Sequence, residues 1–360
     1  MKVKTITCHD VYNLGASLQA YALVSFLKDL GHDAEIIDYK PCYLSRHYSL
    51  TWVPNERYRK PLLREAYLLV KLPSRIKALK SQRKKNFDLF RSEYLPLTKR
   101  YESNESLKAN CPDADVFIAG SDQIWNPVFE NGKDPAFFLE FVPENKKKIS
   151  YAASFAVESL TSEDSERIKP WVKKFDAVSV REKSGVNILN GLQINAEAVL
   201  DPVFLLEKSH WENLAVKSDK KGYILVYDFD KSPEILNIAK KLSEKTGKKI
   251  VTVFPMDIKS EVQSEMGPGE FLGALLNADF VISNSFHATA FSLIFGKEFF
   301  VVNRKEKINT RMRDLLISVD LEDRLISDFI EPNNIDWQKV SELLKPQIDK
   351  SKRFLNDNLI

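Results

Sequence analysis

Residues 279–302, DFVISNSFHATAFSLIFGKEFFVV, carry the pattern of a buried strand, a helix and a second buried strand. The apolar run that ends at Ser283 and the final FFVV are typical of buried parallel strands. Between them, Ser283, Asn284 and Ser285 are favoured helix N-cap residues, and Gly296 is favoured just after a helix. We therefore predict a β-α-β unit whose helix begins within one residue of Ser285 and is ended by Gly296.

The same alternation of apolar strands and helical patterns runs along the 360-residue chain in two sets. The first set contains expected strands at 3–8, 34–39, 115–119, 148–153 and 177–181 and an expected helix at 15–29. The second set contains expected strands at 223–229, 249–254, 279–283 and 299–302 and helices at 233–246, 270–277 and after Ser285. Between the sets, residues 199–221 include an Asp-Pro pair and the polar run KSDKK.

This alternation predicts an α/β protein with parallel sheets. We expect two Rossmann-like, doubly wound domains, residues 1–200 and 201–360, with a ligand cleft between them. The last helix is expected to pack back on the first domain.

Composition and cysteine use favour a cytoplasmic setting. Hydrophobic residues make up 44% of the sequence, which suffices for a full core, and no apolar run reaches the roughly 18 residues that span a bilayer. The opening MKVKTITCHD lacks the hydrophobic stretch of a signal peptide. Cys8, Cys42 and Cys111 are odd in number and widely spaced, which fits neither a disulfide framework nor a thiolate zinc site. No metal is expected.

Positive charge is concentrated in one segment. Residues 41–100 contain 15 Lys and Arg against 4 Asp and Glu, although the whole chain carries only +3. We expect this segment to be a helical insertion in the first domain, with a helix over 61–90 that can break at Pro73. It is either a solvated insertion that packs one face on the domain, or a contact for an anionic surface such as lipid headgroups or a diphosphate-bearing acceptor. The cations proposed for that contact are Arg57, Arg59, Lys60, Arg83, Lys84 and Lys85. No nucleic-acid module accompanies them, so nucleic acid is not an expected partner.

Ligands of open doubly wound sheets bind beyond the carboxyl ends of the strands, so we searched those ends for polar groups. The end of the first strand is followed by Asn13 and Gln19. The end of strand 115–119 is followed by a hydroxyl, a carboxylate, two amides and an indole, namely Ser121, Asp122, Gln123, Trp125 and Asn126. These residues form either an ordinary turn with Trp125 filling a gap, or part of a binding site.

Two further strand ends carry cationic or imidazole groups. Strand 177–181 ends at Arg181, followed by Lys183, and Arg181 is either a surface ion pair or a clamp for phosphate or carboxylate. His287 lies in the first turn of the helix after Ser285, where backbone N–H groups and the helix dipole favour an anion, although a structural histidine is the alternative. Several cations follow the last strand and are either solvated or able to reach the cleft: Arg304, Lys305, Lys307, Arg311 and Arg313.

In combination and in this order, these motifs resemble the polysaccharide pyruvyl transferase family. The resemblance covers most of the chain and rests on NLGASLQAYAL, DVFIAGSDQIWNP, KISYAASFA, VSVREKSG, VLDPVFLL and SNSFHATAFSLIFGKEFFVV followed by NTR. It implies a fold similar to glycosyltransferases of the B type. It also implies transfer of pyruvate from phosphoenolpyruvate to a sugar as a ketal, with the GSDQIWNP branch often linked to capsular or other surface polysaccharides.

The resemblance assigns roles to particular residues. Arg181 in SVRE and His287 in SNSFH match the family's phosphoenolpyruvate-binding arginine and histidine. Many members carry an arginine and a leucine just before that histidine, where this chain has Ser285 and Phe286, so one cation is missing and Arg311 in NTRMR is expected to supply it. Lys183, Asn284 and Ser285 are expected to contribute to substrate binding.

The implied chemistry needs an acid, an anion clamp and a base, and no cofactor other than the donor phosphoenolpyruvate. We expect His287 to act as acid or phosphate binder, Arg181 as clamp and Asp122 as base for the sugar hydroxyls. If the acceptor sugar is carried on a polyprenyl diphosphate, the protein would work at the inner membrane face, held there by its basic insertion.

Two other functions stay open at this point: a glycosyltransferase with a nucleotide-sugar donor, and a catalytically silent carbohydrate-binding protein. Release of phosphate rather than a nucleoside diphosphate separates the first from a pyruvyl transferase, and sugar binding without turnover identifies the second. The sequence predicts neither the acceptor sugar nor the oligomeric state.

Overall fold

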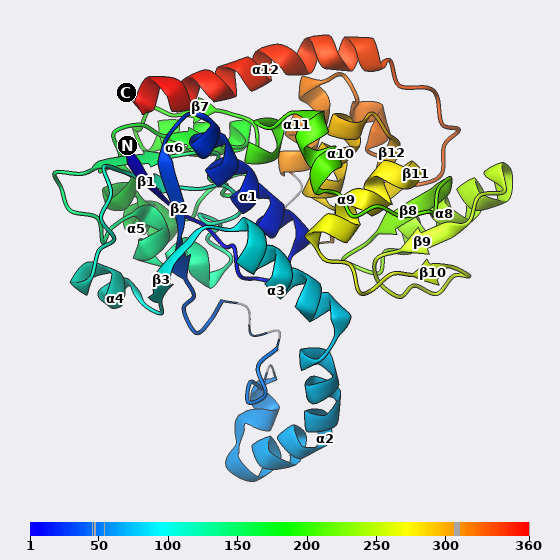
Figure 1. Ribbon diagram of the computed structural model, residues 1–360, viewed down its shortest axis with the longest axis horizontal. Helices are drawn as coiled ribbons and strands as arrows, with labels where there is room; N and C mark the ends of the chain where they lie inside the picture. Colours follow the sequence, from blue (N-terminus) through cyan, green and yellow to red (C-terminus); the bar gives the residue numbers. More distant parts are fainter. Residues whose placement is uncertain (45, 47, 54, 306–309, 360) are drawn as a thin grey trace.

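The computed structural model describes residues 1–44, 46, 48–53, 55–305 and 310–359, and these form two parallel sheets with helices around them (Figure 1). The first sheet has the order β3-β2-β1-β4-β5 and the second β10-β9-β8-β11-β12. The first is built from β1 (Lys2–Ile6), β2 (Asp33–Tyr39), β3 (Leu97–Tyr101), β4 (Val116–Ala119) and β5 (Lys147–Ser150). The second is built from β8 (Tyr223–Tyr227), β9 (Ile250–Thr252), β10 (Glu261–Val262), β11 (Ala278–Ser283) and β12 (Glu298–Val301). A short pair, β6 (Ser179–Val180) and β7 (Glu197–Ala198), continues the first sheet through isolated bridges.

Helices connect the parallel strands. In the first half these are α1 (Leu14–Asp29), α2 (Pro61–Leu79), α3 (Gln82–Tyr94), α4 (Asn104–Ala109), α5 (Ser162–Val172) and α6 (Lys183–Gly191). In the second half they are α7 (Lys208–Leu214), α8 (Pro233–Thr246), α9 (Pro268–Asn277), α10 (Phe286–Phe295), α11 (Thr310–Ser318) and α12 (Trp337–Asn358). Short 3-10 turns lie at η1 (Glu56–Arg59), η2 (Glu130–Lys133), η3 (Pro135–Phe138), η4 (Pro202–Phe204) and η5 (Glu322–Arg324).

The β11-α10-β12 unit forms as its sequence predicts. The Ser285 hydroxyl accepts a hydrogen bond from the backbone N–H of Ala288, and so caps the helix that begins at Phe286. Gly296 has a φ of 65°, the left-handed conformation that glycine adopts without a steric penalty, and it ends the helix.

The two halves share one hydrophobic core. The cluster that contains Leu18 of α1 also contains Phe271 of α9 and Phe291 of α10. Trp211 joins them, with its ring centroid 5.9 Å from that of Tyr21 and 4.9 Å from that of Phe291. Burial of this apolar area from both sides stabilises the relative position of the two sheets.

The C-terminal helix α12 crosses from the second half to the first (Figure 1). The Ser351 hydroxyl of α12 accepts a hydrogen bond of 2.9 Å from the backbone N–H of Leu200. The ring of Phe354 lies 6.3 Å from that of Tyr151, just after β5. The chain therefore ties its last helix to the first sheet.

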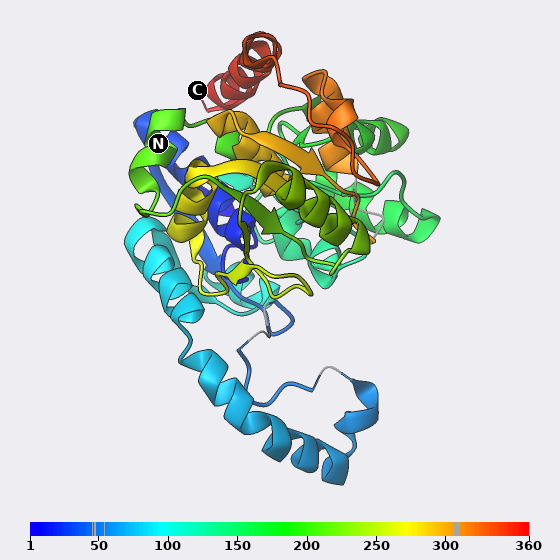
Figure 2. The same cartoon turned by 90° about the vertical axis from the view of Figure 1, so that its right-hand side faces the viewer.

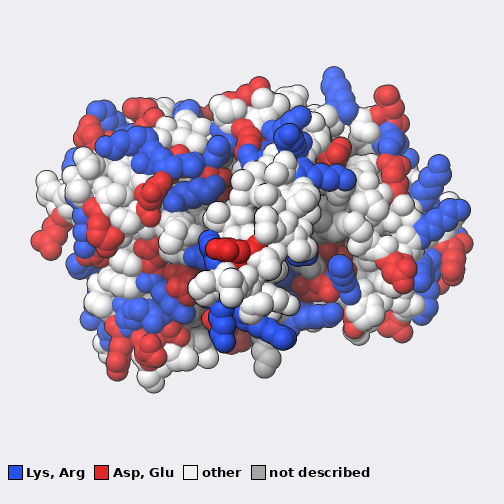
Figure 3. Space-filling model, turned by 90° about the horizontal axis from the view of Figure 1, so that it is seen from below, with Lys and Arg blue, Asp and Glu red and all other residues white. Residues whose placement is uncertain are grey.

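The basic segment differs from its prediction in two ways. The helix does not break at Pro73: α2 continues through it to Leu79, and the break comes at Ser81, which caps α3 by accepting from the N–H of Lys84. Residues 97–101, expected within the helical insertion, instead form the edge strand β3, which pairs in parallel with β2. The segment 55–80 projects from the body (Figures 1 and 2), and Figure 3 views the molecule from the side on which it projects.

Among the described residues, none of the helices combines the length and the apolarity needed to cross a bilayer.

Candidate active site

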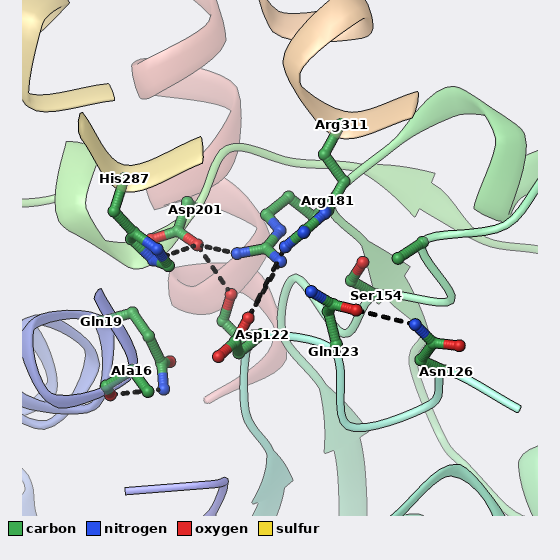
Figure 4. Close-up of polar contacts among 12 residues, drawn as sticks. Ala16, Gln19, Asp122, Gln123, Asn126, Ser154, Arg181, Asp201, His287 and Arg311 are labelled. Atoms are coloured by element: carbon green, nitrogen blue, oxygen red, sulfur yellow. Dashed lines mark hydrogen bonds and ion pairs between the residues drawn. The ribbon is translucent and has the colours of Figure 1, made fainter. Parts of the chain in front are cut away.

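His287 lies where the two halves meet. It is the second residue of α10, and its ring packs on the first turn of α1 (Figure 4). A Cβ atom at Gly15 would lie 1.9 Å from the Nδ1 atom of His287, so only glycine fits at that position. The carboxyl end of β11 is thereby brought against the helix that follows β1, as expected for two doubly wound sheets.

Asp201 is the centre of a buried ion-pair network (Figure 4). Its carboxylate accepts hydrogen bonds from the guanidinium of Arg181 and from the hydroxyl of Ser121, the latter at 3.1 Å. The Nε2 atom of His287 lies 3.6 Å from the same carboxylate oxygen, Oδ2. The backbone N–H of Val203 donates to the other oxygen at 3.1 Å and fixes the orientation of the carboxylate.

Asp122 forms the second carboxylate of this network. Its Oδ1 atom lies 3.3 Å from a guanidinium nitrogen of Arg181 and 3.7 Å from one of Arg311. The backbone of Asp122 has a φ of 74°, an unusual conformation for a residue with a side chain, and its carbonyl accepts from the N–H groups of Ile124 and Ser154. These two bonds hold the strained residue at the end of β4.

The network shifts the ionisation of its members. Burial alone would raise the pKa of Asp201, but Arg181 and then His287 hold it well below its usual range. The pKa of Asp122 is lowered too, because Arg181, His287 and Arg311 outweigh its burial. Burial, with a further contribution from Arg181, lowers the pKa of Arg311 to about 10. Burial raises the pKa of Glu182 in spite of the Arg181 charge.

A cavity of about 320 Å³ opens beside this network. Seven residues singled out from the sequence line it: Asn13, Asp122, Gln123, Asn284, Ser285, His287 and Arg311. Arg304, one of the cations expected either to be solvated or to reach the cleft, lines it too, and four residues that the sequence did not single out for this site complete the lining: Phe129, Phe229, Phe286 and Met312. The cavity therefore combines two guanidinium groups, one imidazole and the first turn of α10 with a single carboxylate, that of Asp122.

Arg181 lies behind Phe286, on a neighbouring cavity of about 220 Å³. The centre of the Arg181 guanidinium is 4.5 Å from the centroid of the Phe286 ring, and that of Arg311 is 5.6 Å from it. Both arginines therefore make cation–π contacts with Phe286, which lines both cavities together with Arg311. Lys183 lines the second cavity, and its backbone N–H donates to Asp314.

Several side-chain nitrogens in this region have no hydrogen-bond partner among the described residues. These buried atoms are Nε of Arg181, Nε2 of His287 and Nε of Arg311. Buried polar groups are rarely left unpaired in proteins, so these three nitrogens are candidate hydrogen-bond donors to a ligand.

The other residues predicted for the site have structural contacts. Ser121 is fully buried and bonds to Asp201, while the Nε2 amide of Gln19 donates to Thr7 and to the Ala16 carbonyl. Trp125 lies in the core, stacked on Phe138 with ring centroids 5.3 Å apart, and its indole N–H donates to the Phe137 carbonyl. The structure thus places Trp125 as a core residue filling a gap, away from the residues that line the cavity.

Amides predicted for substrate binding also hold the backbone. Asn13 caps α1 by accepting from the N–H of Ala16. Asn126 donates to Gln123, and Asn284 accepts from the N–H of Phe229 and donates to Asp228. Asn13, Gln123 and Asn284 reach the cavity, whereas Asn126 lies behind it. Of the cations after β12, Lys307 is outside the described residues.

Asp201 and Phe286 are the main features that sequence reasoning missed. Asp201 lies in an Asp-Pro pair that suggested only a junction, and Phe286 looked like a core residue of the helix. Their roles follow from contacts with Arg181, which is distant in the chain from both. In the described ranges, no three His, Cys, Asp or Glu side chains are grouped so that they could hold a metal ion.

Comparison with known proteins identifies both a family and a fold. The sequence matches the family model described as polysaccharide pyruvyl transferase over residues 13–306. A search of curated proteins finds no significant match. The structure resembles UDP-GlcNAc 2-epimerase from Neisseria meningitidis bound to UDP-GlcNAc, with 11% identity over 100% of this chain and 99% of that chain and a TM-score of 0.50.

Two other solved structures show the same fold. MnaA of S. aureus, in a co-structure with UDP, is 11% identical over 97% of this chain and 88% of its own, with a TM-score of 0.51. UDP-N-acetylglucosamine 2-epimerase from Rickettsia bellii is 12% identical over 100% and 96%, with a TM-score of 0.50. These likenesses confirm the predicted fold, two Rossmann-like halves similar to the glycosyltransferase B type, and at such identities they bear on the fold alone.

Proposed function

The chain belongs to the polysaccharide pyruvyl transferase family, and on that premise we propose that it transfers pyruvate from phosphoenolpyruvate to two hydroxyls of a sugar, forming a ketal and releasing phosphate. The observation that supports this donor is the lining of the cavity of about 320 Å³, where His287, Arg304 and Arg311 meet the first turn of α10. Phosphoenolpyruvate carries a phosphate and a carboxylate. Guanidinium groups and helix N-termini are the protein groups that bind such anions.

Arg311 is the proposed replacement for the arginine that many family members carry at the position of Ser285. Ser285 caps α10 and lines the same cavity as Arg311, so a cation from α11 reaches the space next to the serine. The stacking of Arg311 near Phe286 and its contact with Asp122 hold the guanidinium in that place. The unpaired Nε atom of Arg311 is a donor that a bound carboxylate or phosphate would satisfy.

The proposed reaction begins with a proton added to the methylene carbon of phosphoenolpyruvate, which makes the adjacent carbon electrophilic. One sugar hydroxyl attacks that carbon and loses its proton. The C–O bond to phosphate then breaks, and a second hydroxyl attacks the same carbon and loses its proton. Of the two protons released, one balances the proton taken up by the methylene carbon and the other leaves with phosphate or solvent.

His287 is the proposed proton donor or phosphate ligand, because it lines the cavity and its Nε2 atom is 3.6 Å from Asp201. That carboxylate is ionised because its pKa is held low, so the imidazole lies beside a negative charge. Asp122 is the proposed acceptor of a hydroxyl proton. Its lowered pKa keeps it ionised at neutral pH and makes it a weak base, so its contribution is expected to be modest.

Arg181 is the proposed clamp, acting from beneath the cavity. In this structure two carboxylates, Asp201 and Asp122, already accept its hydrogen bonds. A donor anion would bind beside Arg181 and Arg311 together, and compete with Asp122 for both guanidinium groups.

The acceptor is proposed to be a sugar of a surface or capsular polysaccharide precursor, modified in the cytoplasm, either free or carried on a polyprenyl diphosphate. No cofactor beyond phosphoenolpyruvate is part of this proposal.

Calorimetry with phosphoenolpyruvate tests the donor site. Wild-type protein is expected to bind it saturably, and His287→Ala and Arg311→Ala each to weaken binding by about 10-fold or more, the loss expected for a charge-assisted hydrogen bond. His32→Ala and Arg313→Ala are matched controls, because His32 follows α1 outside the cavity and Arg313 lies two residues from Arg311, paired with Glu158. The proposal would be overturned by a wild-type protein that neither binds phosphoenolpyruvate nor releases its phosphate. Such a protein would instead bind a nucleoside diphosphate and release one from a nucleotide sugar.

A further inference from the structure

Residues 55–80, which comprise η1 and α2 and are called the arm below, project from the body of the protein (Figure 2). None of the residues in η1 or α2 is buried. One side of α2 faces the chain segment that precedes it. Arg75 donates to the carbonyls of Leu50 and Trp52. The rings of Tyr58 and Tyr67 are stacked, with centroids 5.2 Å apart. On the opposite side of α2, no such contact is made by the residues that the structure describes.

That uncovered side is apolar. Leu62, Ala66, Leu69, Pro73 and Ile76 follow one another at intervals of four and three residues, which places them on one face of a helix. Leu62 is 84% exposed and Leu69 71% exposed. Val70, on the edge of this apolar stripe, is 76% exposed. A row of solvent-exposed leucines of this kind is costly in water and marks an interaction surface.

The arm is strongly basic. It contains eight Lys and Arg and two Asp and Glu. Five of its cations are exposed: Lys77 and Lys80 lie beside the stripe, Arg64 and Lys71 lie on the opposite side of the helix, and Lys60 lies just before it. In the view from the side on which the arm projects, the central surface is largely uncharged apart from one acidic patch, and Lys and Arg lie around it together with some Asp and Glu (Figure 3).

We propose that the arm docks on an anionic lipid surface, with the apolar stripe inserted at the headgroup boundary and the cations against lipid phosphates. An apolar face flanked by Lys and Arg is the pattern of helices that lie in the plane of a membrane interface. Each cation near such a surface contributes roughly 1 kcal/mol. A second copy of the chain is a poorer occupant, because two arms joined stripe to stripe would place like charges side by side.

Of the six cations that the sequence suggested for this contact, Arg57, Arg59 and Lys60 belong to the arm, whereas Arg83, Lys84 and Lys85 lie on α3. Arg83 donates to the Met266 carbonyl and lies over the ring of Phe87, with its guanidinium 5.0 Å from the ring centroid. Lys84 is paired with Asp88. These two side chains make contacts within the protein, so the proposed membrane contact is placed on α2 rather than on α3.

Sedimentation with lipid vesicles tests the proposal without any assumption about the reaction. Wild-type protein is expected to sediment with vesicles that contain phosphatidylglycerol, to stay in solution with phosphatidylcholine alone, and to be released by added salt. The triple variant Leu62→Ser, Leu69→Ser, Ile76→Ser and the triple variant Lys71→Glu, Lys77→Glu, Lys80→Glu are each expected to bind at least about tenfold less. All six side chains are exposed, so these variants should fold, as circular dichroism and an unchanged unfolding midpoint would show.

Val128→Ser and Val216→Ser serve as matched controls, because both valines are exposed apolar residues outside the arm. They are expected to bind vesicles as the wild type does. Unchanged vesicle binding in both arm triple variants would overturn the proposal. A second result would also overturn it: a wild-type protein that does not bind vesicles, is a dimer in light scattering, and becomes a monomer in the serine triple variant. The stripe would then be an interface between copies of the chain.

Discussion

The backbone of Gly15 lies directly against the imidazole of His287, so close that a Cβ atom at residue 15 would be 1.9 Å from Nδ1 and 2.2 Å from Cγ. This contact joins the first turn of α1 to the first turn of α10, and hence the two sheets. The position of His287, the proposed proton donor, therefore depends on a glycine at residue 15, in the other half of the protein.

Gly15→Ala is expected to displace His287 and to lower kcat/KM for phosphate release at least about tenfold, because misplacement of a catalytic group by an ångström is enough for such a loss. The unfolding free energy should change less than this local clash suggests, since alanine is preferred over glycine within a helix by up to roughly 1 kcal/mol. Gly191→Ala at the end of α6, where a Cβ meets nothing within 4 Å, is the control and should keep full activity. Equal activity in the two variants would mean that the ring of His287 need not lie where it does.

Asp201→Asn is expected to destabilise the protein by about 3 kcal/mol, because it leaves the buried Arg181 guanidinium without its main counter-charge. The side chains of both residues are almost completely buried. Urea unfolding measures the change. Asp113→Asn, which removes an exposed ion pair with Lys2, is the comparison and should alter stability little. Similar unfolding midpoints for the two variants would contradict a central role for Asp201.

The same carboxylate predicts how stability depends on pH. Because the folded-state pKa of Asp201 lies below its unfolded value of about 3.9, its contribution is fully present at neutral pH and is lost as the pH falls from the unfolded towards the folded pKa. The difference in unfolding free energy between the wild type and Asp201→Asn should therefore be constant from about pH 7 to pH 5 and shrink below about pH 4. A difference that grows on acidification has the opposite sign and would exclude a depressed pKa.

Local patterns were sufficient to predict the parts of the fold that depend on them. The cap at Ser285, the stop at Gly296 and the buried run of β11 are signalled within about twenty residues, and all three are confirmed. The strand β3 was missed because LTKRY is mostly polar and lies at the sheet edge, where only one neighbouring strand and little burial are required. Pro73 was named as a point where the helix can break, yet α2 accommodates it, since an exposed helix can lose one backbone hydrogen bond to solvent.

The candidate site was predictable only as a set of strand ends. The rule for parallel sheets places Asp122 and Arg181 at the carboxyl ends of strands in the first half and His287 at the carboxyl end of β11 in the second, and the structure brings all three into one network. Asp201 could not be foreseen, because its contacts with Arg181 and His287 come from tertiary packing. For Trp125 the sequence left two possibilities open, and its packing on Phe138 agrees with the one in which it fills a gap in the core.

The ionisation of Arg311 gives a prediction at alkaline pH. Burial, with a contribution from Arg181, lowers its pKa to about 10, so this guanidinium loses its charge in a range where arginine ordinarily keeps it. The phosphate of phosphoenolpyruvate is already fully ionised there, so the donor itself does not titrate. Affinity for phosphoenolpyruvate should therefore begin to fall above about pH 9 and be roughly halved near pH 10, with proton uptake on binding in that range. Arg311→Gln should bind weakly throughout and lack the uptake, which calorimetry in buffers of different ionisation enthalpy measures. Identical pH profiles for the wild type and Arg311→Gln, with circular dichroism confirming that both stay folded, would place the donor anion away from α11 and return the missing cation to Arg304 or Arg181.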